Sequence, residues 1–323
     1  MSGIVWNDGS VGSGGGTELA ARQLERRMPA DLIEKFQVHP GVYIPDLVEP
    51  GKIQVLWVHH SHVAKMLAYL GEGGWQRFAR IIFVSNWQAR NITSLYKIPR
   101  SRCQVIRNAV ELVPAADGKF GPLPAGTPVR LAYTSVPDRG LGILAAVFSE
   151  ICKHRDDVEL DVFSTFRLYG AAWGDLDSRF GQVFSLLRSN PRVRCHGPTP
   201  NPEVLATLSQ AHVFAYPATV RETSCMSLME AMSGGLACVH PDYGGLSETA
   251  AGWTRMYPFP QDQQLHAERL YRELMAVITA LRDGDAALLS RLAAQKAFAD
   301  ENYGWDRRAE QWESVLQDLA ATA

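Results

Sequence analysis

Two glutamates eight positions apart, Glu222 and Glu230, are the residues of this sequence best suited to chemistry. A carboxylate can accept hydrogen bonds from hydroxyl groups, or stabilise positive charge that develops in a reaction. The three-residue spacing of methionines between and beyond them predicts a helix over Thr223–Ser233. The start of a helix offers unpaired N–H groups and a partial positive charge, which suit an anionic ligand. The segment is therefore a candidate ligand site.

A purely structural interpretation of the same stretch stays open. Ser227-Leu228-Met229-Glu230 fits a capping box, in which Glu230 would serve the helix start alone. That helix would be only about six residues long, against a usual length of about 11. A start at Thr223 or Ser224 gives a more ordinary helix and places Glu230 inside it.

The elements that must position these acids alternate regularly. Strands are expected at Ile53–Val58, Arg80–Ser85, Cys103–Arg107, Val129–Thr134, Val158–Ser164, Val193–His196, Val213–Tyr216 and Ala237–His240. Helices are expected at Trp87–Tyr96, Leu141–Lys153, Asp175–Arg188, Pro202–Gln210, Thr223–Ser233, Gln261–Arg282, Ala286–Asp300 and Trp305–Leu319. This alternation predicts an α/β fold with parallel sheets that helices cover on both faces.

A segment rich in proline and glycine, Val113–Pro128, divides the chain. It predicts a linker over about residues 110–128. The expected domains are therefore residues 1–125 and residues 126–323, with a cleft between them. The second domain ends in helices, and the last of these could pack back on the first domain.

Two histidines, His59 and His60, directly follow the first strongly apolar strand, which is expected at Ile53–Val58. Polar residues just beyond the carboxyl end of a parallel strand lie where open α/β sheets bind ligands. Either histidine could carry a proton or donate a hydrogen bond, and a solvated loop histidine is the alternative.

A glycine-rich stretch, Gly9–Glu18, precedes a helix with Leu19, Leu24 and Met28 on one side. Such a loop can approach a phosphate or a sugar closely. It matches neither the dinucleotide fingerprint, since Thr17 replaces the third glycine, nor a P-loop. A plain turn explains it equally well.

Composition narrows the class of protein. The chain has 323 residues, of which 46% are hydrophobic and 20% are charged, and no apolar run approaches the roughly 18 residues of a membrane helix. No signal peptide is recognisable at the N-terminus. Five scattered cysteines, without a C-x-x-C pair, favour a reducing, cytoplasmic location and argue against zinc.

The charge balance excludes a typical nucleic-acid binder, because the net charge is -2. Residues 1–125 carry 14 lysines and arginines against 10 acids, while the remainder carries 18 against 24. The basic first half could favour an anionic acceptor or peripheral association with the inner face of a membrane. A solvated charged surface explains the same asymmetry.

Four stretches resemble, in order and spacing, retaining glycosyltransferases of the GT-B fold, specifically glycosyltransferase family 4. They are the segment from Phe83-Val84-Ser85 through Tyr96-Lys97-Ile98-Pro99 to Val105-Ile106-Arg107-Asn108, the turn Asp138-Arg139-Gly140-Leu141, the segment Val213–Glu230 with its two glutamates, and the loop Asp242–Glu248. The resemblance implies two Rossmann-like domains and transfer of a sugar from a nucleotide-diphosphate-sugar donor to a hydroxyl acceptor, with retained anomeric configuration. It implies neither a cofactor nor a catalytic metal.

The resemblance also assigns roles to individual residues. Glu230 would accept from ribose hydroxyls, Glu222 would contact the donor sugar near its reacting carbon, and His59, or else His60, would lie near that sugar. Arg139 could bind the diphosphate as a fork. The remaining donor contacts would be Gly140, Arg221, Ser224, Cys225, Met226, Gly15 and Gly16.

Departures from the family pattern leave two alternatives open. Thr134-Ser135-Val136 lacks the usual arginine, Ala109 replaces a glycine, and Cys225 replaces another. A non-catalytic binding or scaffolding subunit with the same fold would tolerate these changes. A nicotinamide-dependent oxidoreductase is the other alternative, but no strand has both the glycine turn and the acid that it needs.

Two further features are better explained without chemistry. Cys225 has no base nearby in the sequence and is expected to be a small packing residue. Asp175 and Asp177 are paired aspartates with one residue between them that could suggest a metal, and capping of a helix explains them better.

Overall fold

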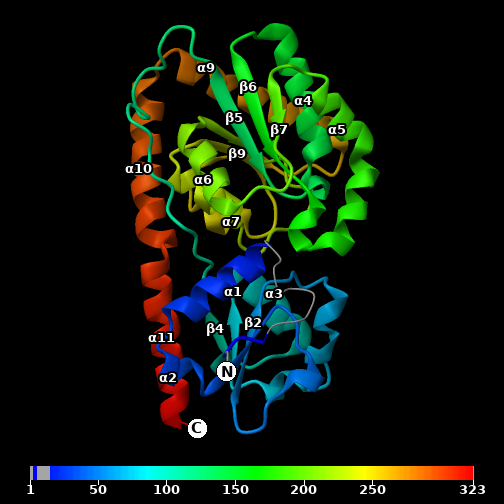
Figure 1. Ribbon diagram of the computed structural model, residues 1–323, viewed down its shortest axis with the longest axis vertical. Helices are drawn as coiled ribbons and strands as arrows, with labels where there is room; N and C mark the ends of the chain where they lie inside the picture. The colour runs from blue at the N-terminus through cyan, green and yellow to red at the C-terminus, as the bar shows by residue number, and fades with distance from the viewer. Residues whose placement is uncertain (1–2, 6–14, 323) are drawn as a thin grey trace. The chain divides into compact units, whose positions relative to one another are not determined.

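The computed structural model describes residues 3–5 and 15–322, and its contacts divide the chain into two compact units (Figure 1). The first unit consists of Met1–Val110, Glu222–Met226 and Tyr303–Ala323, and the second of Glu111–Arg221 and Ser227–Asn302. The first unit thus ends its main stretch at Val110, whereas the sequence suggested residue 125. It also includes the C-terminal helix and the segment that carries Glu222.

The first unit is built on a parallel sheet of four strands in the order β1-β2-β3-β4. The strands are β1 (Phe36–Pro40), β2 (Ile53–Val58), β3 (Arg80–Phe83) and β4 (Cys103–Val105). Its helices are α1 (Gly16–Arg27), α2 (Ala30–Ile33), α3 (Asn86–Tyr96) and α11 (Trp305–Thr322). The indoles of Trp57 on β2 and Trp312 on α11 are both buried and meet edge to face, with centroids 4.9 Å apart. Such a contact ties α11 into the core of this unit.

The second unit contains a parallel sheet of six strands in the order β10-β9-β8-β5-β6-β7. The strands are β5 (Val129–Thr134), β6 (Val158–Phe163), β7 (Val193–Cys195), β8 (Val213–Ala215), β9 (Ala237–Asp242) and β10 (Arg255–Pro258). Its helices are α4 (Leu141–His154), α5 (Gly181–Arg188), α6 (Asn201–Gln210), α7 (Met226–Ser233), whose first residue is assigned to the first unit, α8 (Leu246–Ala250), α9 (Gln263–Arg282) and α10 (Ala286–Tyr303). The strand order reverses direction between β5 and β8. Ligands bind at such a switch point in open α/β sheets, outside the carboxyl ends of the strands.

The predicted α/β class, with parallel sheets and helices between the strands, is confirmed. The strands expected at Ile53–Val58 and Val129–Thr134 have those bounds in the structure. The sequence missed β1 and β10, which are the edge strands of their sheets. Their polar and proline content, in Phe36–Pro40 and Arg255–Pro258, hides the apolar run that marks a central strand.

The helix predicted over Asp175–Arg188 is wrong in its first half. Residues Ala171–Phe180 form 3₁₀ turns, and the α-helix begins only at Gly181. Asp177 explains the difference, because its carboxylate accepts from the Thr165 hydroxyl at 2.5 Å and from the Phe166 N–H at 2.8 Å. These bonds hold the segment against the end of β6, in place of a regular helical start.

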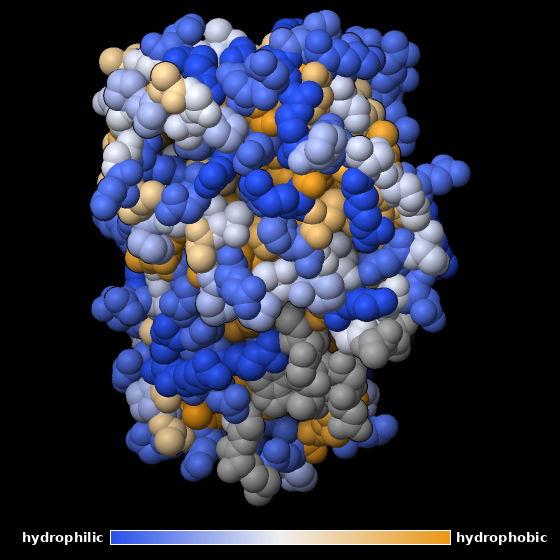
Figure 2. Space-filling view, turned by 45° about the horizontal axis from the view of Figure 1, so that its top comes forward, coloured by the Kyte–Doolittle hydropathy of each residue, from blue (hydrophilic) through white to orange (hydrophobic). Residues whose placement is uncertain are grey.

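Other 3₁₀ turns lie at Pro45–Leu47, Lys65–Leu70, Gly74–Arg77, Arg100–Arg102, Pro137–Arg139 and Phe166–Tyr169. No helix among the described residues is long and apolar enough to cross a bilayer. On the face drawn in Figure 2, polar side chains surround small, separate apolar patches.

Candidate functional site

Arg139 and Gly140 lie on a tight turn after β5, at the start of α4. Gly140 has a φ of 99°, and a Cβ placed on it would lie 1.9 Å from the carbonyl oxygen of Pro217. The Thr219 hydroxyl donates to the Asp138 carbonyl at 2.7 Å. The turn is therefore fixed against the loop that follows β8, and Arg139 is held at the carboxyl edge of the second sheet.

That close approach makes a testable prediction about Gly140. We expect Gly140→Ala to lower the free energy of unfolding by about 1–3 kcal/mol, because alanine is strained at positive φ and its methyl would collide with backbone. Urea denaturation of the two proteins measures the change. Gly252→Ala is the matched control, since Gly252 also has positive φ but a Cβ there meets nothing within 4 Å. Equal losses in both variants would contradict a specific role for the contact with Pro217.

Glu230 is a buried carboxylate with almost no partner. It lies within α7 and is 7% exposed. Among the described residues, the one hydrogen bond of its carboxylate comes from the Asn201 side-chain amide at a long 3.5 Å. Burial raises the pKa of Glu230 to about 7, against an opposing effect of the hydrogen bond from Asn201. The carboxyl group can therefore bind a ligand hydroxyl without first giving up a strong protein partner.

Two buried hydroxyl groups at the same edge of this sheet have no partner in the described part of the chain. They are Thr134 Oγ1, at the end of β5, and Ser164 Oγ, directly after β6. The Ser227 hydroxyl donates to the Thr134 carbonyl at 2.7 Å, which joins the first turn of α7 to β5. Buried polar groups are normally hydrogen-bonded, so this edge suits a polar ligand. Thr134 and Ser164 are not among the site residues predicted from the sequence, although polar residues at the ends of apolar strands are a signal that could have indicated them.

The start of α7 differs from the prediction, because the helix begins at Met226 and not at Thr223. The Thr223 hydroxyl donates to the His59 carbonyl at 3.0 Å, and the Ser224 carbonyl accepts from the Asn108 amide at 3.1 Å. These bonds hold Thr223 and Ser224 in a loop, within the first unit. Ser227 lies inside the helix and bonds to Thr134, so it is not the N-cap of a capping box with Glu230.

Glu222 and His59 belong to the first unit, where they are joined through Thr223. Glu222 is 6% exposed. The His59 ring packs on Trp57, with centroids 4.5 Å apart, and its Nε2 atom is buried without a partner in the described residues. Burial, helped by the nearby His60, lowers the pKa of His59 to about 3. With this pKa the imidazole is neutral at neutral pH. His59 is therefore better suited to form a hydrogen bond with a ligand than to act as a proton carrier.

His60 has a different environment from His59. Its backbone carbonyl accepts from the Gln88 amide at 2.8 Å, and its ring lies beside Gly41, where an added Cβ would be 3.1 Å from Nε2. Burial lowers the pKa of His60 as well. His59 directly follows β2 and has a buried ring nitrogen without a partner in the described residues, and His60 has no such nitrogen. His59 is therefore the better candidate of the two for a ligand contact.

The remaining predicted donor contacts fall in both units. Gly16 is the first residue of α1, and a Cβ on it would lie 3.2 Å from the Met226 sulfur, with Gly15 before it as the N-cap. Cys225 is buried, as a packing residue would be. The exposed Arg221 lies over the Tyr243 ring at 5.7 Å from its centroid. The rest of the glycine-rich stretch, Gly9–Gly14, lies outside the described residues.

No group of His, Cys, Asp or Glu side chains in residues 3–5 and 15–322 is arranged to hold a metal ion. Asp177 instead caps the turn at Thr165 and Phe166, which differs from the expected capping of its own helix.

Part of the chain matches a known protein family. Residues 129–274 match the family model described as "Glycosyl transferases group 1". They include β5, the Arg139 turn, Glu230 and most of α9. No curated protein matches the sequence significantly.

Solved structures show the fold. A glycosyltransferase from Rickettsia africae aligns with a TM-score of 0.67 and 12% identity, over 94% of this chain and 82% of its own. Sucrose-phosphate synthase from Thermosynechococcus elongatus aligns with a TM-score of 0.59 and 18% identity, over 84% and 69%. The Anabaena protein HepE, solved with UDP and glucose, aligns with a TM-score of 0.62 and 16% identity, over 83% and 72%. The fold is that of GT-B glycosyltransferases, and together with the family-model match it supports a GT-B glycosyltransferase.

Proposed function

We propose that this protein is a retaining glycosyltransferase that moves a sugar from a nucleotide-diphosphate-sugar donor to a hydroxyl group of an acceptor. The observation that carries the proposal is the buried Glu230, whose carboxyl group has a pKa raised to about 7 and one long hydrogen bond. It lies in the region that matches the glycosyltransferase model. A ribose offers two neighbouring hydroxyls, which are the donors that such a carboxyl group lacks.

In this proposal the diphosphate binds at the Arg139 turn. A guanidinium presents a fork of N–H donors that matches phosphate oxygens, and the N-terminus of α4 adds its partial positive charge. Gly140 is required there because no side chain fits beside Pro217. Arg221 supplies a second cation, in place of the arginine that Thr134-Ser135-Val136 lacks, and Ser224, Cys225 and Met226 supply backbone contacts.

The chemistry is assigned to the first unit. Cleavage of the bond between sugar and diphosphate leaves positive charge on the reacting carbon, and the Glu222 carboxylate would stabilise that charge. His59, neutral and with an Nε2 that has no partner among the described residues, would hold a sugar hydroxyl. The leaving diphosphate would be neutralised by Arg139 and by helix N-termini, so the proposal needs no metal ion.

We place the activity in the cytoplasm, because all five cysteines are free. The acceptor is proposed only as a sugar, a lipid-linked molecule or a small molecule with a hydroxyl group. Peripheral contact with an anionic membrane surface through the basic first 125 residues is part of the same proposal.

A panel of nucleoside diphosphates tests the proposed donor. We expect one of UDP, GDP, ADP and dTDP to raise the melting temperature of the protein, since a ligand that binds only the folded state stabilises it. Glu230→Ala should abolish that shift, because the ribose loses its acceptor. Glu203→Ala, an exposed acid on α6, is the control and should keep it. If no nucleotide or nucleotide sugar stabilises the wild type, the proposal fails.

A further inference from the structure

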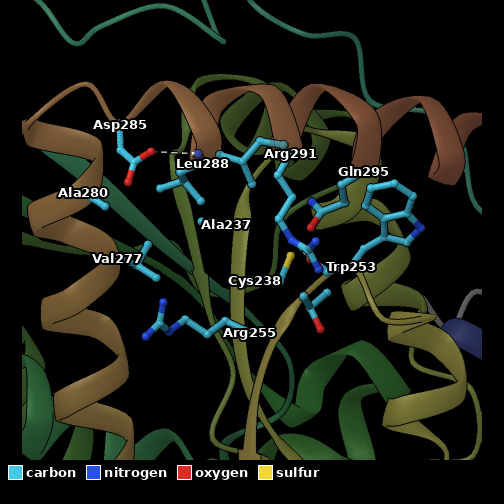
Figure 3. A pocket seen from close by; sticks show the side chains of 12 residues that line it. Ala237, Cys238, Trp253, Arg255, Val277, Ala280, Asp285, Leu288, Arg291 and Gln295 are labelled. Atoms are coloured by element: carbon cyan, nitrogen blue, oxygen red, sulfur yellow. Dashed lines mark hydrogen bonds between the residues drawn. The ribbon is translucent and has the colours of Figure 1, made fainter.

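A cavity of about 320 Å³ lies in the second unit, beside the amino ends of β9 and β10 (Figure 3). It is lined by the first residues of β9 and β10, by the end of α9 and by the first turns of α10. The proposed donor contacts of this unit follow the carboxyl ends of β5 and β8, or lie on α7. The cavity is therefore separate from the residues to which the glycosyltransferase proposal assigns a role.

The inner wall of the cavity is apolar. Ala237, Val277, Ala280, Leu288 and Leu292 line it. The only buried thiol there, that of Cys238, has its pKa raised by burial and its sulfur donates to the Leu236 carbonyl at 3.3 Å. A strongly hydrated ion would gain no favourable contact with these apolar side chains. An apolar ligand group would cover them and so remove their surface from water, which is favourable. Small-molecule sites of this size class combine such walls with a few polar groups.

The rim carries two arginines with spare hydrogen-bonding capacity. Arg291 extends from α10 into the pocket in Figure 3. Its Nε and Nη2 donate to the carbonyls of Trp253 and Gly252, and its guanidinium lies 5.7 Å from the Trp253 ring centroid. These contacts fix the guanidinium but use only part of its five N–H donors. Arg255 donates from its Nε to Glu273 at 2.6 Å, which is the one side-chain hydrogen bond it makes in the described part of the chain.

Of the two acids near the pocket, Asp285 uses one carboxylate oxygen and Glu273 is paired with arginines. Asp285 accepts from the N–H groups of Ala287 and Leu288 and so caps α10. Glu273 accepts from both Arg255 and Arg272. The other polar lining residues, Thr254 and Gln295, are bonded to His240 Nε2 and to the Leu236 carbonyl. Among the described residues, the lining groups with several unused N–H donors are therefore the arginines at the rim.

We propose that this cavity binds a small monocarboxylate with an apolar, single-ring body. The ring occupies the space between α9 and α10, and the carboxylate meets Arg291 at the rim, where Arg255 adds a second positive charge to the lining. Charge-assisted bonds to a guanidinium supply the orientation, and burial of the ring supplies the remaining affinity. This inference does not depend on the proposed transfer reaction.

Isothermal titration with 3-phenylpropionate, its neutral amide 3-phenylpropanamide, and inorganic phosphate tests the site. We expect saturable binding of 3-phenylpropionate, with the amide and phosphate each weaker by about tenfold or more, because each lacks one half of the recognition. No saturable binding of the carboxylate, or equal binding of the amide or of phosphate, would overturn the proposal.

Variants locate the binding in the cavity. Ala280→Leu fills the apolar space and should abolish binding, and Arg291→Gln should weaken it about tenfold. Arg255→Gln is a second test that leaves the backbone contacts of Arg291 intact. Arg272→Gln is the matched control, because Arg272 also pairs with Glu273 but does not line the pocket. The binding of a variant is compared with that of the wild type only if the two proteins have the same melting temperature. Binding that survives Ala280→Leu, or that Arg272→Gln weakens as much as Arg291→Gln, would refute the assignment.

Discussion

Glu222→Gln should lower the rate of sugar transfer by a factor of about 10²–10³, while nucleotide binding stays within about twofold of the wild type. The substitution keeps the shape of the side chain and removes only its negative charge. If the carboxylate stabilises charge that exists in the transition state alone, kcat falls and the affinity for the bound nucleotide does not. Hydrolysis or transfer of the donor identified by the nucleotide panel provides the measurement.

The control for this experiment is Glu34→Gln, which removes an exposed acid from the same unit. It should leave the rate unchanged. A Glu222→Gln protein with the wild-type rate would remove Glu222 from the mechanism. If the wild type binds a nucleotide but shows neither transfer nor donor hydrolysis, a non-catalytic scaffolding role is favoured. The replacement of the family's glycines by Ala109 and Cys225 would then be consistent with a loss of catalysis.

Glu230→Gln should make the protein more stable than the wild type at pH 8 but not at pH 4. Burial raises the pKa of Glu230 from 4.5 to about 7 in the folded protein. Below pH 4.5 the carboxyl group is protonated in both states and costs nothing. Between pH 4.5 and 7 the unfolded chain releases the proton first, so the wild type loses stability as the pH rises, and the loss is complete above pH 7.

The size of this effect follows from the pKa difference and reaches up to about 3 kcal/mol. Urea denaturation of wild type and Glu230→Gln at pH 4 and pH 8 measures it as a difference of differences, in which all other titrating groups cancel. Glu203→Gln, an exposed acid on α6, should show no such pH dependence. A pH-independent difference for Glu230→Gln would mean that Glu230 is ionised and paired when the protein is folded.

Much of the fold could be predicted because apolar runs and turn residues are local signals. The strands Ile53–Val58 and Val129–Thr134 are central and buried, so their sequences are nearly continuous apolar runs. The helix after Arg139-Gly140 begins as expected at Leu141. Edge strands such as β10 carry weaker patterns, because one side of the strand has no neighbour to exclude water.

The start of α7 shows where local signals fail. Thr223 and Ser224 are residue types that commonly begin a helix. In the structure they lie in a loop, because the Thr223 hydroxyl donates to the His59 carbonyl and the Ser224 carbonyl accepts from the Asn108 amide. Those partners lie more than a hundred residues away in the sequence. No spacing rule within the segment could have revealed them.

The sequence by itself determined that the protein has an α/β fold with parallel sheets, and it singled out Glu222 and Glu230 as a pair of acids around a helix start. Only the tertiary structure decided what surrounds each acid. Glu230 is buried beside Asn201, with its pKa raised to about 7. The hydroxyls of Thr134 and Ser164, which have no partner within residues 3–5 and 15–322, lie at the same edge of the sheet. The physical reason is that desolvation and hydrogen-bond satisfaction depend on atoms brought together from distant strands, whereas helix and strand periodicity is written in neighbouring residues.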